Sequence, residues 1–97
     1  MARVLPKDRA NDILVKQVIR SAASVGANIA EGFGRYKGKE YERFLQVALG
    51  SANETEYWLM ILAEINPRFS FKIKEIMKIN SESIKMLAKS LQTLRKS

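Results

Sequence analysis

The fold class follows from residues 39–65, KEYERFLQVALGSANETEYWLMILAEI. Steps of four and three separate seven side chains in this segment: Tyr41, Leu45, Ala48, Ala52, Thr55, Leu59 and Leu62. Such spacing places them on one stripe of an α-helix and is typical of a coiled-coil seam. A second line runs beside the first: Phe44, Val47, Ser51, Glu54, Trp58, Ile61 and Ile65. The segment is therefore predicted to be a long helix, apolar over more than one stripe, which Asn66-Pro67 ends.

Helices are also predicted on either side of this segment. Over residues 8–31, Asp8 is the expected N-terminal cap, and Gly32 and Gly34 are expected to end the helix in the left-handed conformation. The stripe of this helix holds Leu14, Val18, Ala22, Val25 and Ile29. Over residues 70–94 the stripe holds Ile73, Met77, Asn80, Ile84, Leu87, Leu91 and Leu94. Three long helices with short connections predict an all-α, antiparallel helical bundle in a single domain, residues 1–97.

Three features of the predicted helices bear on packing. Asn80 interrupts an apolar seam, where it either fixes the register or points to water. In a three-helix monomer Trp58, Ile61 and Val47 would partly face water, so a further helix or subunit is expected over them, unless the core wraps around the middle helix. Gly26 costs about 1 kcal/mol in a helix, which suggests that another backbone packs closely against it. The line of small residues around it comprises Ile19, Ala23, Gly26, Ala27 and Ala30.

The composition excludes several kinds of chemistry. Among the 97 residues there is no cysteine and no histidine. The chain therefore lacks thiolate nucleophiles, histidine acid–base catalysts and the usual ligands of zinc. We expect a protein that is not an enzyme and that needs no cofactor or metal. No apolar run approaches the roughly 20 residues that span a bilayer, and the N-terminus lacks the apolar core of a signal peptide, so a cytoplasmic location is expected.

Charge is unevenly distributed along the chain, which has a net charge of +7. The first 38 residues hold seven basic and three acidic side chains, residues 39–67 hold two and five, and residues 68–97 hold eight and two. A helix rich in cations can bind the phosphates of DNA or RNA without reading their sequence. The candidate contacts on the third helix are Lys72, Lys74, Lys78, Lys85 and Lys89, and Arg95 and Lys96 add further cations. The alternative is a solvated face, or one that pairs with an acidic helix of a neighbour.

The loop between the first two helices is a second candidate contact. Within Gly34-Arg35-Tyr36-Lys37-Gly38-Lys39, three cations and one aromatic ring lie close together. Tyr36 could stack on a base while Arg35, Lys37 and Lys39 hold phosphates. A plain polar turn is the alternative.

Polar side chains near the seams are predicted to be structural. These are Arg20, Asn28, Glu31, Arg43 and Glu54, together with Glu56. Glu54 and Glu56 are two positions apart, so they point in nearly opposite directions on a helix and cannot share one catalytic site. We expect ion pairs with Arg20 or Arg43 that fix the register.

Two motifs carry a family resemblance. The first spans residues 19–32, IRSAASVGANIAEG, and the second combines KEYERFL at residues 39–45 with ALGSANETE at residues 48–56. From Leu5 to about Leu94 the chain resembles the bacterial four-helix-bundle family of proteins encoded in intervening sequences of 23S ribosomal RNA genes. The accessory variability determinant of diversity-generating retroelements is in the same family. Members of this family usually have another helix, containing a tryptophan, before the position of Leu5-Pro6, whereas four residues precede that point here.

The resemblance implies a small helical bundle that assembles as a ring-like homopentamer. The retroelement member is a basic ring that binds nucleic acid and its reverse transcriptase. No catalytic residues are carried over, and Asn28, Glu31 and Glu54 correspond to positions that look structural. The leading hypothesis is thus a non-catalytic homo-oligomer that binds RNA or DNA, as an accessory to a ribosome- or reverse-transcriptase-related complex. The alternative is a protein–protein interaction module without nucleic-acid binding.

Overall fold

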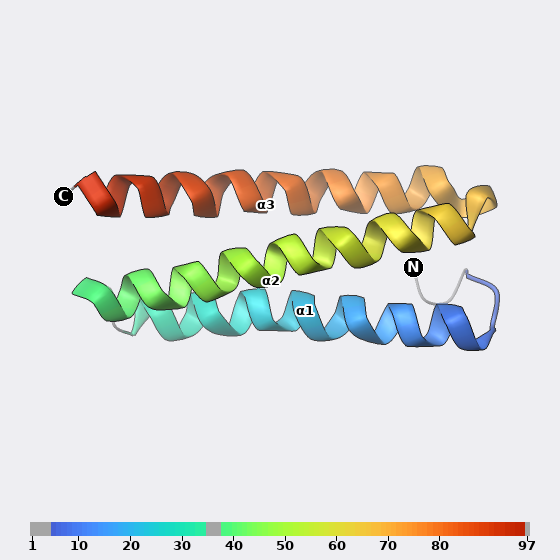
Figure 1. Ribbon diagram of the computed structural model, residues 1–97, viewed down its shortest axis with the longest axis horizontal. Coiled ribbons are helices and arrows are strands. Elements are labelled where there is room, and N and C mark those ends of the chain that lie inside the picture. The colour runs from blue at the N-terminus through green and yellow to red at the C-terminus, as the bar shows by residue number, and fades with distance from the viewer. Residues whose placement is uncertain (1–4, 35–37, 97) are drawn as a thin grey trace.

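A computed structural model describes residues 5–34 and 38–96, and this part of the chain forms three long antiparallel helices (Figure 1). Helix α1 comprises Arg9–Phe33, α2 comprises Gly38–Ile65 and α3 comprises Ser70–Lys96. A short 3-10 helix, Pro67–Phe69, joins α2 to α3. The molecule is elongated, with extents of 47 × 19 × 15 Å. The prediction of an all-α helical bundle is confirmed.

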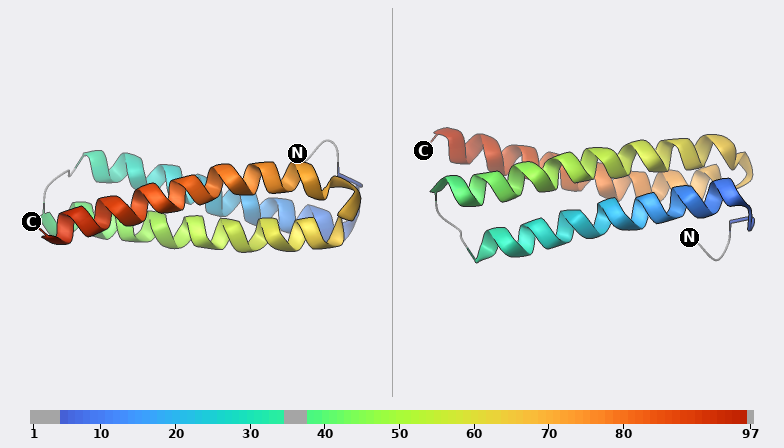
Figure 2. Two further views of the ribbon diagram at one scale, coloured as in Figure 1. Left: turned by 90° about the horizontal axis from the view of Figure 1, so that it is seen from above. Right: turned by 60° about the horizontal axis from the view of Figure 1, so that its bottom comes forward.

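Helix α2 is the central helix of the bundle. It packs against both α1 and α3, whereas no Cα atoms of α1 and α3 lie within 8 Å of each other in the described residues. Figure 1 shows α2 running between its two neighbours, and the turned views of Figure 2 show that the three helices do not lie in one plane. This arrangement explains why α2 is apolar over more than one stripe, since it packs against a helix on two sides.

The core consists of two apolar clusters along α2. One cluster lies near the α2–α3 turn and contains Val18, Leu59, Leu62 and Ile73, with Leu5 packed against them from the segment before α1. The other cluster lies near the opposite end and contains five buried residues: Leu45, Ala48, Ala52, Leu87 and Leu91. All seven predicted seam positions of α2 are buried or half-buried, as the spacing predicts.

The start of α1 agrees with the prediction, but its end does not. Asp8 caps the helix, because its carboxylate accepts a hydrogen bond of 2.8 Å from the Asn11 amide. The helix runs through Gly32 to Phe33, and Gly34 has φ −68°, which is right-handed rather than the left-handed conformation expected from glycine. Gly32 instead permits a close approach, since a Cβ there would lie 3.2 Å from the Tyr41 ring and 3.4 Å from Phe44 Cβ. A larger residue would therefore separate the end of α1 from the start of α2.

Asn80 fixes the packing of α3 on α2. Its side-chain amide donates hydrogen bonds of 2.9 Å to the Ala52 carbonyl and to the Glu56 carboxylate. Ser81 adds a hydrogen bond of 3.2 Å to the same carboxylate. Of the two alternatives for Asn80, the register role is the one that the structure supports.

The three side chains of α2 that were expected to face water in part do so, but the strongest apolar exposure lies on other helices. Trp58 is half-buried against the first cluster and Ile61 is also half-buried, because α1 and α3 flank α2 on two sides; only Val47 is exposed. The strongly exposed apolar side chains lie on the outer helices instead. Among these, Ile19 of α1 is 60% exposed, and Ile79 and Met86 of α3 are 66% and 70% exposed.

The packing contact expected at Gly26 is absent from the described part of the chain. A Cβ at this position would meet no atom within 4 Å. The small residues around Gly26 therefore form an open strip on α1 rather than a close contact between two helices of one chain.

Candidate nucleic-acid interface

Five lysines form a row along the outward side of α3. Lys85 and Lys89 each precede a buried leucine, Leu87 or Leu91, by two positions, so they point away from α2. We call these five residues the lysine row, and its successive members are four or seven positions apart along the chain: Lys74, Lys78, Lys85, Lys89 and Lys96. All five are exposed, and none forms an ion pair with another described residue. The row extends over about 33 Å at 1.5 Å per residue.

Lys72 does not belong to this row. It precedes Ile76 by four positions and Ile79 by seven, so it shares their side of α3. The structure therefore separates Lys72 from the other four lysines predicted on this helix. This difference could have been predicted from the sequence, because the spacing of each lysine from the apolar stripe of the helix shows on which side it lies.

A second group of cations lies where α2 begins and α3 ends. Lys39, in the first turn of α2, lines a shallow hollow with Arg43 and Arg95. Arg95 also lines a hollow with Lys85, Lys89 and Lys96, so it connects Lys39 to the end of the lysine row. Arg35, Tyr36 and Lys37 lie outside the described residues.

Arg95 is a connecting residue that was not predicted as a contact. Its Nε donates a hydrogen bond of 2.8 Å to Glu42, and its guanidinium also contacts the Gln46 side chain. These contacts fix the last turn of α3 on the first turns of α2. The pairing of Arg95 with Glu42 depends on the antiparallel register of α2 and α3, which cannot be predicted from the distribution of charge along the chain.

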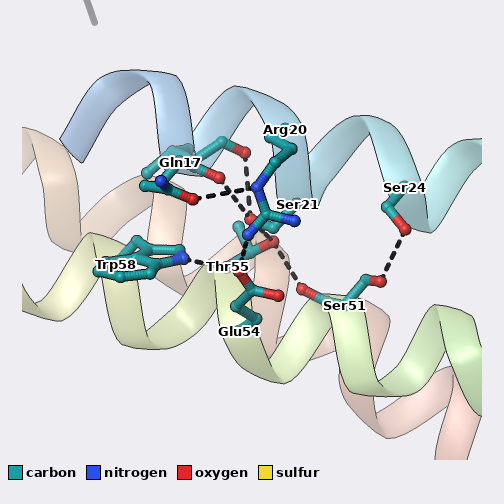
Figure 3. A network of polar contacts seen from close by, with 9 residues as sticks. Gln17, Arg20, Ser21, Ser24, Ser51, Glu54, Thr55 and Trp58 are labelled. Carbon is teal, nitrogen blue, oxygen red and sulfur yellow. Dashed lines mark hydrogen bonds and ion pairs between the residues drawn. The ribbon is translucent and has the colours of Figure 1, made fainter. Parts of the chain in front are cut away.

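The predicted ion pair on α1 and α2 is present. Arg20 pairs with Glu54, and the Trp58 indole donates a hydrogen bond of 3.0 Å to the same carboxylate (Figure 3). The Trp58 hydrogen bond, together with the positive charge of Arg20, holds the pKa of Glu54 below 4.5, against the opposing effect of desolvation. This carboxylate is thus kept ionised, and its hydrogen-bond partners give it a structural role.

Hydroxyl groups continue this contact between the two helices. Thr55 Oγ1 lies 2.7 Å from Ser21 Oγ and 2.8 Å from the Ser51 carbonyl. The hydroxyls of Ser24 and Ser51 form a second pair at 2.8 Å (Figure 3). We call these four residues, with Arg20, Glu54 and Trp58, the polar seam. Small side chains and internal hydrogen bonds here let α1 and α2 pack closely without an unsatisfied buried group.

The remaining polar candidates have local contacts. The Asn28 side chain donates to the Ser24 carbonyl at 2.8 Å and contacts the Ser24 hydroxyl at 3.2 Å. Arg43 approaches Glu40 at 3.7 Å and lies 4.7 Å above the Phe44 ring, so it pairs within α2 and not with another helix. Glu31 is exposed near the end of α1. Glu54 faces α1 while Glu56 accepts from α3, which confirms that the two carboxylates point apart.

Two further features of the described residues bear on ligands and membranes. These residues contain no group of three or more acidic, histidine or cysteine side chains that could hold a metal ion. Among the described helices, none is long and apolar enough to cross a bilayer.

The fold and this surface define a class: an all-α bundle of long antiparallel helices with one strongly cationic outer helix. Within that class the chain belongs to the 23S rRNA-intervening sequence protein family, whose family model matches residues 1–89. No curated protein and no solved structure matches the chain.

Proposed function

We propose that the protein is a non-catalytic, oligomeric binding protein that presents the lysine row and Lys39 to RNA or DNA. The observation that carries the proposal is that five exposed lysines share one side of α3 without an acidic partner in the described chain. Unpaired cations at this spacing can each contact a phosphate and release its counterion. The sequence predicts that Arg35, Tyr36 and Lys37 also contact the nucleic acid. The physiological role would be that of an accessory to a ribosome- or reverse-transcriptase-related complex.

The test is fluorescence anisotropy with labelled duplex DNA and a structured RNA over a series of salt concentrations. Binding should weaken linearly in a plot of log affinity against log salt, and the slope counts the phosphate contacts. No binding at about 50 mM salt, where such contacts are strongest, would exclude this function.

A pair of variants links the binding to the lysine row. Lys85→Gln should reduce the salt slope by about one, because one phosphate contact is lost. Lys72→Gln is the matched control, with the same charge change on the same helix but on the side of Ile76 and Ile79. Equal salt slopes for Lys85→Gln and Lys72→Gln would contradict the proposal that the lysine row contacts the phosphates.

We also propose that copies of the chain assemble through the uncovered apolar residues of α1 and α3. The support is the strong exposure of Ile19, Ile79 and Met86, and the open space around Gly26. Surfaces of this kind commonly mark protein contacts. The resemblance suggests a pentamer for the assembly.

Analytical ultracentrifugation of two glycine variants tests the assembly. Gly26 and Gly50 are both helical, exposed and without neighbours within 4 Å of a Cβ. Gly26→Leu should block the assembly, whereas Gly50→Leu, on α2, should not. A stable wild-type monomer at micromolar concentration would refute this part of the proposal.

The same exposed apolar side chains favour a second candidate function, a protein–protein interaction module whose lysines serve solubility. The two candidates differ in one result. Retained self-assembly together with no nucleic-acid binding at about 50 mM salt would favour the interaction module.

A further inference from the structure

Phe71 is an aromatic side chain that lies outside both clusters of the core. It is 78% exposed, the most exposed large apolar side chain among the described residues. Its neighbours two positions away differ: Phe69 packs against the first core cluster, and Ile73 is buried within it. Because positions two apart on a helix point in nearly opposite directions, Phe71 faces solvent while its neighbours anchor the start of α3.

Phe71 lies at the head of the lysine row. It precedes Lys74 by three positions and Lys78 by seven, which is the spacing of one side of a helix. The other exposed apolar residues of α3 lie elsewhere, since Ile76, Ile79 and Met86 follow one another at steps of three and seven on the side of Lys72. On its own side of α3, Phe71 is thus the exposed aromatic ring next to five lysines, with the two carboxylates Glu75 and Glu82 beside them.

The chemistry of this combination distinguishes single strands from duplexes. Lysines contact phosphates in either form, because both expose their backbones. An exposed aromatic ring can stack on an unpaired base, whereas the bases of a duplex are enclosed by their neighbours. We infer that the lysine row binds single-stranded RNA or DNA and that one base stacks on Phe71. This inference rests on the proposed function and specifies its ligand.

Charge complementarity favours a nucleic acid over an apolar protein surface as the occupant. A protein partner that buried Phe71 would also have to accommodate Lys74 and Lys78, whose charges are costly to remove from water. A strand places phosphates and bases side by side, so it satisfies both kinds of group at once. At about 3.4 Å per stacked nucleotide, the row of about 33 Å corresponds to roughly ten nucleotides.

The experiment compares two strands and three proteins by fluorescence anisotropy. The strands are a labelled oligomer of about ten thymines and an abasic strand with the same number of phosphates. The proteins are the wild type, Phe71→Leu, which keeps an apolar side chain but removes the ring, and Phe71→Tyr, which keeps the ring. Ile65→Ala is the control for loss of an exposed apolar group elsewhere, since Ile65 of α2 is 48% exposed and lies outside the proposed assembly surface. Circular dichroism verifies that each variant is folded.

We expect the wild type to bind the thymine strand about fivefold to a hundredfold more tightly than the abasic strand, the usual range for one stacked base. Phe71→Leu should reduce that difference, because one ring that can stack is lost, while Phe71→Tyr and Ile65→Ala retain it. Affinity for a duplex of equal length should not change in Phe71→Leu.

Three results would overturn the inference, and they can be told apart. Equal thymine affinity for wild type and Phe71→Leu, with a salt slope that Lys85→Gln still lowers, would refute base stacking and leave the proposed function intact. No binding of any strand at about 50 mM salt would refute both. A change in self-association rather than in nucleic-acid affinity would assign Phe71 to a protein contact.

Discussion

The polar seam between α1 and α2 and the lysine row on α3 use polar side chains in opposite ways. In the seam each polar group has a partner on the facing helix or on its own backbone, as in the 2.7 Å contact between Thr55 and Ser21. In the row none of the five lysines has an acidic partner within the described residues. The comparison separates groups whose interactions stabilise the fold from groups that are free to bind a ligand.

This difference has a direct consequence for mutations. Removal of a partnered, buried group leaves its partner without a hydrogen bond and destabilises the fold. Removal of an unpartnered surface group changes stability little, so its effect should be confined to binding. Four predictions test the distinction.

The largest effect is expected for Asn66→Ala. Asn66 and Asn11 are buried and exchange side-chain hydrogen bonds of 2.8 and 3.1 Å across the α1–α2 interface. The variant leaves the side-chain oxygen Oδ1 of Asn11 without this partner, so it should lower the free energy of unfolding by about 1–3 kcal/mol. Urea denaturation measures the loss. Asn53→Ala, at an exposed position of α2, is the control and should change stability by less than about 0.5 kcal/mol.

Thr55→Val should have the next largest effect. The substitution preserves shape but removes the hydroxyl that contacts Ser21 Oγ and the Ser51 carbonyl. Ser21 keeps its hydrogen bond of 2.9 Å to the Gln17 carbonyl, so the expected loss is smaller, about 0.5–1.5 kcal/mol in urea denaturation. An increase in stability would show that the polar seam does not contribute as described.

A smaller contrast is expected between two cations of α3. Arg95→Gln removes the contacts to Glu42 and Gln46 and should cost about 0.2–1 kcal/mol, the range of exposed ion pairs. Lys85→Gln should leave thermal stability unchanged, because Lys85 has no partner. If Lys85→Gln destabilised the protein as much as Arg95→Gln, Lys85 would have a stabilising contact in the folded protein, and the lysine row would not be free of partners.

The smallest effect is a dependence of stability on pH at Glu54. Since the pKa of Glu54 is lowered in the folded protein, the unfolded chain binds its proton first as the pH falls. The contribution of Glu54 is therefore present above the ordinary pKa of 4.5 and is lost as the pH falls through the folded pKa. Urea denaturation between about pH 6 and pH 3 should give a steeper loss for wild type than for Glu54→Gln. Parallel curves would contradict a lowered pKa.

Much of the fold could be predicted because its signals are local. The spacing of apolar residues placed all three helices, and the cap at Asp8 followed from the preference of aspartate for that position. The predicted end of α1 was wrong, because Gly32 serves a close approach to Tyr41 and Phe44 and not a left-handed turn. That approach depends on how α1 and α2 cross, which the local pattern does not contain.

The candidate site could be predicted less completely. Of the five lysines predicted as contacts on α3, Lys74, Lys78, Lys85 and Lys89 share one side of the helix, whereas Lys72 lies on another side, and Arg95 was not assigned as a contact. The side of the helix on which a lysine lies follows from its spacing from the apolar residues, and this spacing can be read from the sequence. The link from Lys39 through Arg95 to the row could not be predicted, because it joins the start of α2 to the end of α3.

The sequence by itself determined the helices, their lengths, the cationic character of α3 and the family, because each depends on residue type and on the period of a single helix. Only the tertiary structure decided that α2 packs against both other helices, that Arg20 pairs with Glu54, and that Asn80 binds α2. These contacts depend on the register and crossing of helices, which the sum of all packing contacts fixes at once.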